Sequence, residues 1–225
     1  MKRHIFSALS LFLVAAIAHA DAPEPPSARA VAEAAQGFYD QVDTLEARFS
    51  QRYHHRIYQR TQTSTGRLRF DDAGRMRFDY DAPNGKVIVS NGVNLVAYEP
   101  TDGHGPGQYV KTPVSEDGLH SGFAFLTGRA RILDDYRVRL LDNERYNWRG
   151  HVLELRPRAQ DPNVRRILLF VDGRTDTFGV VHRVRIDDHE GNQNQLTLQS
   201  MRLNRDLGAS AFRFVPPAGA RRVGT

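Results

Sequence analysis

The sequence predicts a fold that is mainly β with some α (α+β): one large antiparallel sheet, curled into an incomplete, unclosed β-barrel, with helices on its concave side. Two observations predict the sheet. Residues 66–100 contain four short runs of alternating apolar and polar side chains, each ending at a turn signal, and the alternation returns from residue 136 onward. A third observation predicts the helices: apolar residues recur every three or four positions in residues 28–49, and residues 122–128 form a compact apolar cluster between glycines.

The four runs within residues 66–100 form the centre of the predicted sheet. Glycine, proline and asparagine separate them at residues 71–74, 82–85 and 90–92, and Asn-Gly is the strongest short hairpin signal. Because strand side chains alternate between faces, one face carries arginine and aspartate. The other face carries the large apolar side chains, which we take to include Leu68, Phe70, Met76, Phe78, Tyr80, Ile88 and Tyr98.

The first 20 residues are typical of a secretory signal peptide. Lys2 and Arg3 precede an apolar run at residues 5–17, and Ala18-His19-Ala20 fits a small-residue cleavage site. We therefore expect a single mature domain at residues 21–225. Cysteine is absent, so the domain has no disulfide and no cysteine for a bacterial lipid anchor, and we expect a soluble exported protein.

Residues 28–49 are predicted to be helical, with Ser27 as N-cap, because apolar residues recur every three or four positions. Gly37 and residues 42–44 weaken this prediction and allow a break into two helices. From about residue 47 to residue 58 the pattern becomes strand-like. The apolar stripe comprises Val31, Ala34, Ala35, Phe38, Val42, Leu45 and Phe49.

The second half of the chain returns to strands. Ser200 interrupts the alternation of its neighbours and predicts a β-bulge. Between the two strand regions, residues 122–128 form an apolar cluster between glycines and are predicted to be a short helix or two, a second cover for the sheet. The predicted strands lie at residues 136–141, 153–156, 167–171, 180–187, 196–203 and 212–214.

No catalytic motif, cofactor motif or metal-binding motif is present. The histidine pair at residues 54–55 and the group formed by His182 with residues 187–190 contain ligand-type side chains, but alternation along a strand sends neighbours to opposite faces. The formal net charge of +5 is spread through the strands and includes Lys2 and Arg3 of the leader. It favours a solvated sheet face and excludes a clustered nucleic-acid site. What the sequence offers is apolar surface, which is compatible either with a filled core or with a ligand cavity.

A series of short motifs resembles the family of the outer-membrane lipoprotein carrier LolA of Gram-negative bacteria. Each motif is weak alone, but their order and spacing cover nearly the whole mature chain. The motifs are LEARFSQ (residues 45–51), GRL (66–68), MRFDYDAP (76–83), VSNG (89–92), FLTG (125–128), DDHEGN (187–192) and FRFVPPAG (212–219).

The resemblance implies an unclosed β-barrel with a helical lid over an apolar cavity. It also implies a monomeric periplasmic carrier, without catalytic activity, cofactor or metal, that takes triacylated lipoproteins from an inner-membrane LolCDE-type ABC transporter to an outer-membrane LolB-type receptor. The residues expected to bind acyl chains are Leu68, Phe70, Met76, Phe78, Tyr80, Ile88 and Tyr98 of the sheet, with Phe38, Phe125 and Leu126 of the lid.

One turn departs from the family pattern. The best-studied carriers have a basic residue before a proline in the turn after the strand that begins with Gly66, and this residue latches the lid. Here residues 71–74 are Asp-Asp-Ala-Gly, so Arg69 or Arg75 is expected to replace the latch, unless the lid closes differently.

Two alternatives remain at this point. The protein could carry another amphiphile, such as a glycolipid or an outer-membrane pigment. It could also be a secreted hydrolase that uses the region from His182 to Glu190.

Overall fold

The computed structural model describes residues 25–101, 105–114 and 131–224. The predicted signal peptide, the cluster at residues 122–128 and, with it, Phe125 and Leu126 lie outside the described residues. In chain order the elements are α1 (Ala28–Tyr39), β1 (Thr44–His55), β2 (Arg60–Asp71), β3 (Met76–Tyr80), β4 (Val87–Ser90), β5 (Asn94–Glu99), β6 (Gln108–Pro113), α2 (Ile132–Asp135), β7 (Tyr136–Leu141), η2 (Glu144–Tyr146), β8 (His151–Pro157), β9 (Arg166–Val171), η3 (Thr175–Thr177), β10 (Val181–Asp187), β11 (Gln193–Leu203), η4 (Ala209–Phe212) and β12 (Arg221–Arg222).

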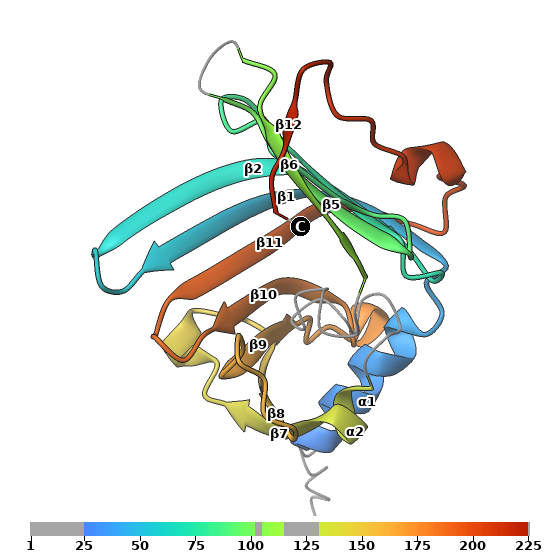
Figure 1. Cartoon of the computed structure of the whole chain (residues 1–225). Coiled ribbons are helices and arrows are strands. Elements are labelled where there is room, and N and C mark those ends of the chain that lie inside the picture. The colour runs from blue at the N-terminus through green and yellow to red at the C-terminus, as the bar shows by residue number, and fades with distance from the viewer. Residues whose placement is uncertain (1–24, 102–104, 115–130, 225) are drawn as a thin grey trace, which may run out of the picture.

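The strands form one 12-stranded sheet that bends into an unclosed barrel (Figure 1), which confirms the predicted fold class. The order is β12-β6-β5-β4-β3-β2-β1-β11-β10-β9-β8-β7, so β12 and β7 are the two edges and do not pair with each other. All neighbours are antiparallel except β12, which lies parallel to β6. The long strands β1 and β11 at the centre join a first half, β2–β6, to a second half, β7–β10.

Alternation gives the sheet an inner face, which carries the main core, and an outer face. Phe49 of β1 pairs with Gly66 of β2 and lies over it, because a side chain at Gly66 would overlap the Phe49 ring. In this position the Phe49 ring packs edge-on against two other rings. Its centroid lies 5.1 Å from that of Tyr80 and 5.7 Å from that of Phe78. The glycine of the GRL motif therefore makes room for an aromatic cluster on the inner face.

Helix α1 is shorter than predicted. The Ser27 hydroxyl accepts a hydrogen bond from Ala30 N–H, as expected of an N-cap, but the helix ends at Tyr39 and β1 begins at Thr44. The prediction of helix as far as residue 49 was wrong because Leu45 and Phe49 fit both a helical stripe and a two-residue alternation. Within the part of the chain that the structure describes, no helix is long and apolar enough to cross a membrane.

The C-terminal segment also differs from the prediction. The predicted bulge at Ser200 is confirmed, since this residue has a φ of 52° where the β1–β11 register shifts. The predicted strand at residues 212–214 is wrong: Phe212 ends the 3-10 helix η4 and is buried on the outer face, under the guanidinium of Arg75. Phe214 then packs on Tyr98, with ring centroids 5.4 Å apart. Residues 212–214 therefore pack on the outer face of the sheet and do not form the predicted strand.

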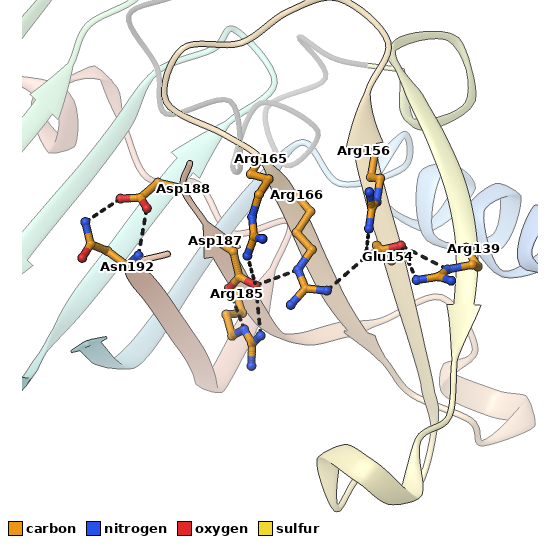
Figure 2. A network of polar contacts seen from close by, with 9 residues as sticks. All are labelled: Arg139, Glu154, Arg156, Arg165, Arg166, Arg185, Asp187, Asp188 and Asn192. Carbon is orange, nitrogen blue, oxygen red and sulfur yellow. Dashed lines mark hydrogen bonds and ion pairs between the residues drawn. The ribbon is translucent and has the colours of Figure 1, made fainter. Parts of the chain in front are cut away.

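A polar network covers the outer face of the second half (Figure 2). Glu154 of β8 is 2% exposed, and its carboxylate accepts hydrogen bonds from Arg139, Arg156 and Arg166. Arg166 also donates to the fully buried Asp187 at 2.7 Å. Burial opposes ionisation of Glu154, but the bonds from Arg156 and Arg166 outweigh it and lower the pKa of the carboxyl group. Both buried carboxylates therefore have guanidinium partners.

Candidate functional site

The inner face of the second half, which we call the closed half, is a packed core on β8, β9 and β10. Helix α1 covers it through contacts with β7 and β8. The Tyr39 hydroxyl donates to the Val181 carbonyl oxygen and accepts from the Val181 N–H, both at 3.3 Å. Burial raises the pKa of Tyr39, so its hydroxyl stays protonated and keeps this bond. The side chains of this face that have no exposed surface include Leu153, Leu155, Ile167, Leu169 and Val184.

The inner face of β2–β5, which we call the open half, is apolar but less completely covered. Leu68 and Phe70 of β2 are 2% and 1% exposed, and Met76 and Phe78 of β3 are 4% and 6% exposed. Tyr80, Ile88 and Leu95, further toward the edge, are only partly buried. Register places these side chains on one surface, since Leu68 pairs with Phe78 and Phe78 with Ile88. Six of the seven sheet residues predicted from sequence are thus brought together.

A small cavity of about 50 Å³ lies in the open half. Its two polar members bond to each other, because Gln51 Nε2 donates to Asn194 Oδ1 at 2.8 Å. Burial raises the pKa of Tyr80, and a hydrogen bond with Gln51 opposes that shift. The apolar surface therefore ends at three polar side chains, Gln51 of β1, Tyr80 of β3 and Asn194 of β11. The full lining is Gln51, Met76, Phe78, Tyr80, Ile88, Asn194 and Leu196. Gln51 and Asn194 were not predicted as site residues, although alternation from Phe49 already placed Gln51 on the inner face.

Tyr98 was wrongly placed on this surface. It pairs with Val87, whereas the inner-face residue Ile88 pairs with Ala97. Tyr98 therefore points to the outer face, where Phe214 covers it. The error arose because β5 carries Leu95 on the inner face and Tyr98 on the outer face, and size alone does not assign a face.

Neither arginine predicted as a latch reaches toward the inner face. Arg69 lies on the outer face, where it donates to Glu46 at 2.9 Å and to Asp79 at 3.1 Å. Arg75 donates to Asp71 at 2.6 Å within the turn and stacks on Phe212. Alternation with Leu68 and Phe70 dictates the orientation of Arg69. The predicted latch role of both residues is therefore corrected: they fix the outer face and the β2–β3 turn.

Comparison with known proteins identifies the family. The family described as "Outer membrane lipoprotein carrier protein LolA" matches residues 40–215. The chain belongs to the LolA family. An outer-membrane lipoprotein carrier protein of Methylibium petroleiphilum is 27% identical over 221 residues, covering 98% of each chain. That of Azotobacter vinelandii is 26% identical over 215 residues, covering 93% of this chain and 95% of the relative. A solved LolA superfamily structure from Nitrosomonas europaea aligns with a TM-score of 0.45 and 16% identity, covering 84% of this chain and 99% of that chain.

The lid expected of a LolA protein is only partly where the sequence predicted it. Phe38 of α1 is partly buried in the core, beside Gly179 and Tyr39. It lies on the closed half, away from the predicted cavity residues of β2–β4, because α1 packs on β7 and β8. Figure 1 shows α1 and α2 together at that end of the curled sheet.

Polar contacts that the sequence did not predict join the two helices of this LolA protein. Gln36 Oε1 accepts a hydrogen bond from Ile132 N–H at 2.9 Å, and Asp40 pairs with Arg131 at 3.0 Å. Arg131 N–H also donates to Asp135 at 2.7 Å. The contacts of Gln36 and Asp40 fix α2 to α1, and no sequence pattern marked them, since the partners in these two contacts are more than 90 residues apart.

The residues considered for a hydrolase do not converge. His182 Nε2 lies 3.0 Å from Asp172 Oδ2, whereas His189 Nε2 lies 2.8 Å from the Asp161 carbonyl oxygen. His182 lies at the start of β10 and His189 lies beyond its end, so most of the strand separates the two histidines. Among the described residues, no three His, Cys, Asp or Glu side chains lie close enough together to hold a metal ion.

A second hollow, larger than the cavity of the open half, is polar and lies at the rim. It measures about 1120 Å³ and is lined mainly by polar side chains of β2 and of the turns after β3 and β5. Lys86 and Glu99 pair across it at 2.7 Å. A polar, open lining does not suit acyl chains, so its size does not make it the lipid site.

Proposed function

We propose that this LolA-family protein is a periplasmic carrier that holds the acyl chains of lipoproteins on the inner face of the open half. The observation that carries this proposal is the apolar surface formed by Phe78, Tyr80 and Ile88, which is incompletely buried although it adjoins a well-packed core. Relatives named outer-membrane lipoprotein carrier proteins support the class of cargo.

Acyl chains need such a surface because each methylene removed from water contributes about 0.8 kcal/mol. The cavity of about 50 Å³ holds little more than one water or one methylene group. Loading therefore requires the open half to widen. The closed half, held by Tyr39 and α1, stays packed during that movement and keeps the sheet in shape.

We further infer the surrounding pathway from family membership. The first 20 residues direct export to the periplasm, where residues 21–225 act as a single monomeric domain without catalytic activity. An inner-membrane LolCDE-type transporter supplies triacylated lipoprotein, and a LolB-type receptor at the outer membrane accepts it. The acyl chains contact Leu68, Phe70, Met76, Phe78, Tyr80 and Ile88, together with Phe125 and Leu126, whereas Phe38 stays packed in the closed half.

The test is release of lipoprotein from inner-membrane vesicles. Purified protein is incubated with ATP and vesicles that carry a triacylated lipoprotein, and a soluble one-to-one complex is expected after the vesicles are removed. Ile88→Gln should lower the yield of complex about tenfold, because it places an amide in the acyl site. Val93→Gln is the matched control, since Val93 is 69% exposed and should tolerate the change.

Absence of any soluble complex with the unmodified protein would contradict lipoprotein carriage. Mass spectrometry of lipids that copurify with the protein then tests the remaining alternative, a glycolipid or pigment as cargo. Replacing His182 and His189 by alanine should leave the yield of complex unchanged, and loss of a hydrolytic activity on that change would support the hydrolase instead.

A further inference from the structure

The tip of the β1–β2 hairpin exposes two large apolar side chains. The turn at residues 56–59 places Ile57 at 69% and Tyr58 at 76% exposure. Within the described part of the chain, the other exposed large apolar residues, Val93, Val110 and Val215, are isolated from one another in sequence. Figure 1 shows this hairpin reaching out at one end of the sheet. Single exposed apolar residues are ordinary, whereas an adjacent pair at a protruding tip points to a binding role.

The part of the hairpin that leads to the tip is also free of acidic residues. Between Glu46 and Asp71 the sequence has six arginines and no aspartate or glutamate. Three of the six, at positions 48, 67 and 69, pair with carboxylates of neighbouring strands. Among the described residues, Arg52 and Arg60 form no ion pair. Arg56, in the turn itself, donates to the Glu190 carbonyl oxygen at 3.3 Å, whereas Arg52 and Arg60 are available to a partner with negative charge.

The adjacent β10–β11 turn limits this charge. It carries Asp188 and Glu190, and both carboxylates accept hydrogen bonds from the Asn192 side chain. With these two carboxylates at the foot of the tip, the local excess of positive charge is small. Ile57 and Tyr58 must then supply most of the binding free energy, and the arginines make the tip prefer a negatively charged surface.

Hydrogen bonds and side-chain contacts tie the tip to the β10–β11 turn and to β1. Arg56 N–H donates to Asn192 Oδ1 at 2.9 Å, and the Arg56 side chain lies against Gly191. Gln59 Nε2 donates to the Arg56 carbonyl oxygen at 2.7 Å. The Tyr58 ring lies 4.5 Å from the ring of His55 on the inner side. A hollow of about 410 Å³ adjoins these rings and is lined by Tyr53, His55, Tyr58, Arg60 and Gln62.

We propose that this tip is a membrane contact, which inserts Ile57 and Tyr58 into the interfacial layer of a bilayer that carries anionic headgroups. An aliphatic side chain beside a tyrosine suits that layer, where the ring is apolar and its hydroxyl stays hydrated. Arg52 and Arg60 face phosphate groups, which guanidinium binds well. The inner face of β1 leads from Phe49 past Gln51 to this end, so the contact directs the end of the open half toward the bilayer. The inference holds whatever amphiphile the protein carries.

The test uses the absence of cysteine from the chain. Ile57→Cys and, as matched control, Val93→Cys are each labelled with an environment-sensitive fluorophore, since both native residues are 69% exposed. Vesicles of phosphatidylethanolamine and phosphatidylglycerol should shift the emission to the blue and raise its intensity at position 57 alone. Nitroxide-labelled lipid in the same vesicles should quench it. Equal responses at the two positions, or none at either, would overturn the proposal.

An unlabelled double variant supplies the second measurement. Ile57→Ser combined with Tyr58→Ser should lower flotation with these vesicles about tenfold, with an unchanged circular dichroism spectrum, because both side chains are exposed. This variant should still form the soluble lipoprotein complex, so failure of membrane contact is distinguishable from failure of carriage. If the fluorescence change or the flotation occurred only with vesicles that also contain inner-membrane proteins, the partner would be a protein, and the proposed bilayer contact would be wrong.

Discussion

The closed half and the open half of the sheet are built from the same kind of strand, but they differ in how completely their inner faces are covered. On β8 and β9, Leu155 and Leu169 have no exposed surface. On β3 and β4, Phe78 retains 6% exposure and Ile88 is only partly buried. The difference follows from α1, whose main contacts with the sheet are with β7 and β8.

This comparison separates two roles of apolar side chains in one continuous core. A side chain without exposed surface contributes its full transfer free energy to folding. A partly exposed side chain contributes less to folding. A ligand that covers its remaining apolar surface gains the rest of the transfer free energy. We therefore expect substitutions in the closed half to affect stability and substitutions in the open half to affect cargo.

The largest expected effect is that of Leu155→Ala. The substitution leaves a cavity in a fully packed region under α1, so the free energy of unfolding should fall by about 3–4 kcal/mol. Urea denaturation followed by circular dichroism measures it. A decrease in the free energy of unfolding smaller than about 1 kcal/mol would show that the closed half relaxes as readily as the open half. It would contradict the proposed difference between the two halves.

Gly66→Ala tests the aromatic cluster at the border of the two halves. A Cβ at residue 66 would overlap both the Asp79 carbonyl oxygen and the Phe49 ring. Because backbone cannot yield, we expect a loss of about 2–3 kcal/mol. Combining it with Phe49→Leu should recover only part of the loss, because the clash with the Asp79 carbonyl oxygen remains. Full recovery would show that the ring alone requires the glycine.

Glu154→Gln tests the outer face of the closed half. At pH 7 the variant should be about 2 kcal/mol less stable, because three arginines lose a buried carboxylate. The pKa of Glu154 is lowered in the folded protein, so its contribution is present above the ordinary carboxyl pKa of about 4.3 and is lost as the pH falls through the folded value. The stability difference between the two proteins should therefore narrow below about pH 4. A difference that is constant from pH 7 to pH 3 would contradict this assignment.

The sequence predicted the sheet because alternation is a local property. The strands around Leu68, Phe78 and Ile88 were assigned to the correct face, and Ser200 was recognised as a bulge, from neighbouring residues alone. The order and spacing of short motifs along the chain predicted the LolA family. These features need no knowledge of what lies across the core.

The features that the sequence did not reveal depend on distant partners. Residues 40–49 leave the helix because β1 pairs with both β2 and β11, although their apolar spacing also fits a helix. Phe212 and Tyr98 were misplaced because the C-terminal segment packs across the outer face of β3–β5. Arg69 and Arg75 were expected to latch a lid, but Glu46 and Asp71 hold them, and contacts of Gln36 and Asp40 with the start of α2 join the helices instead.

Ile88→Ala has the smallest expected effect on stability and sharpens the comparison most. Because Ile88 is partly exposed beside an existing cavity, the loss in free energy of unfolding should be about 1 kcal/mol, well below that of Leu155→Ala. The same substitution removes apolar contact from the proposed acyl site, so the lipoprotein complex should dissociate several-fold faster in a transfer assay. Leu155→Ala, assayed at a temperature where it remains folded, should release cargo at the unmodified rate. If cargo retention followed stability across the two variants, the open half would be an ordinary part of the core, with no separate role in binding.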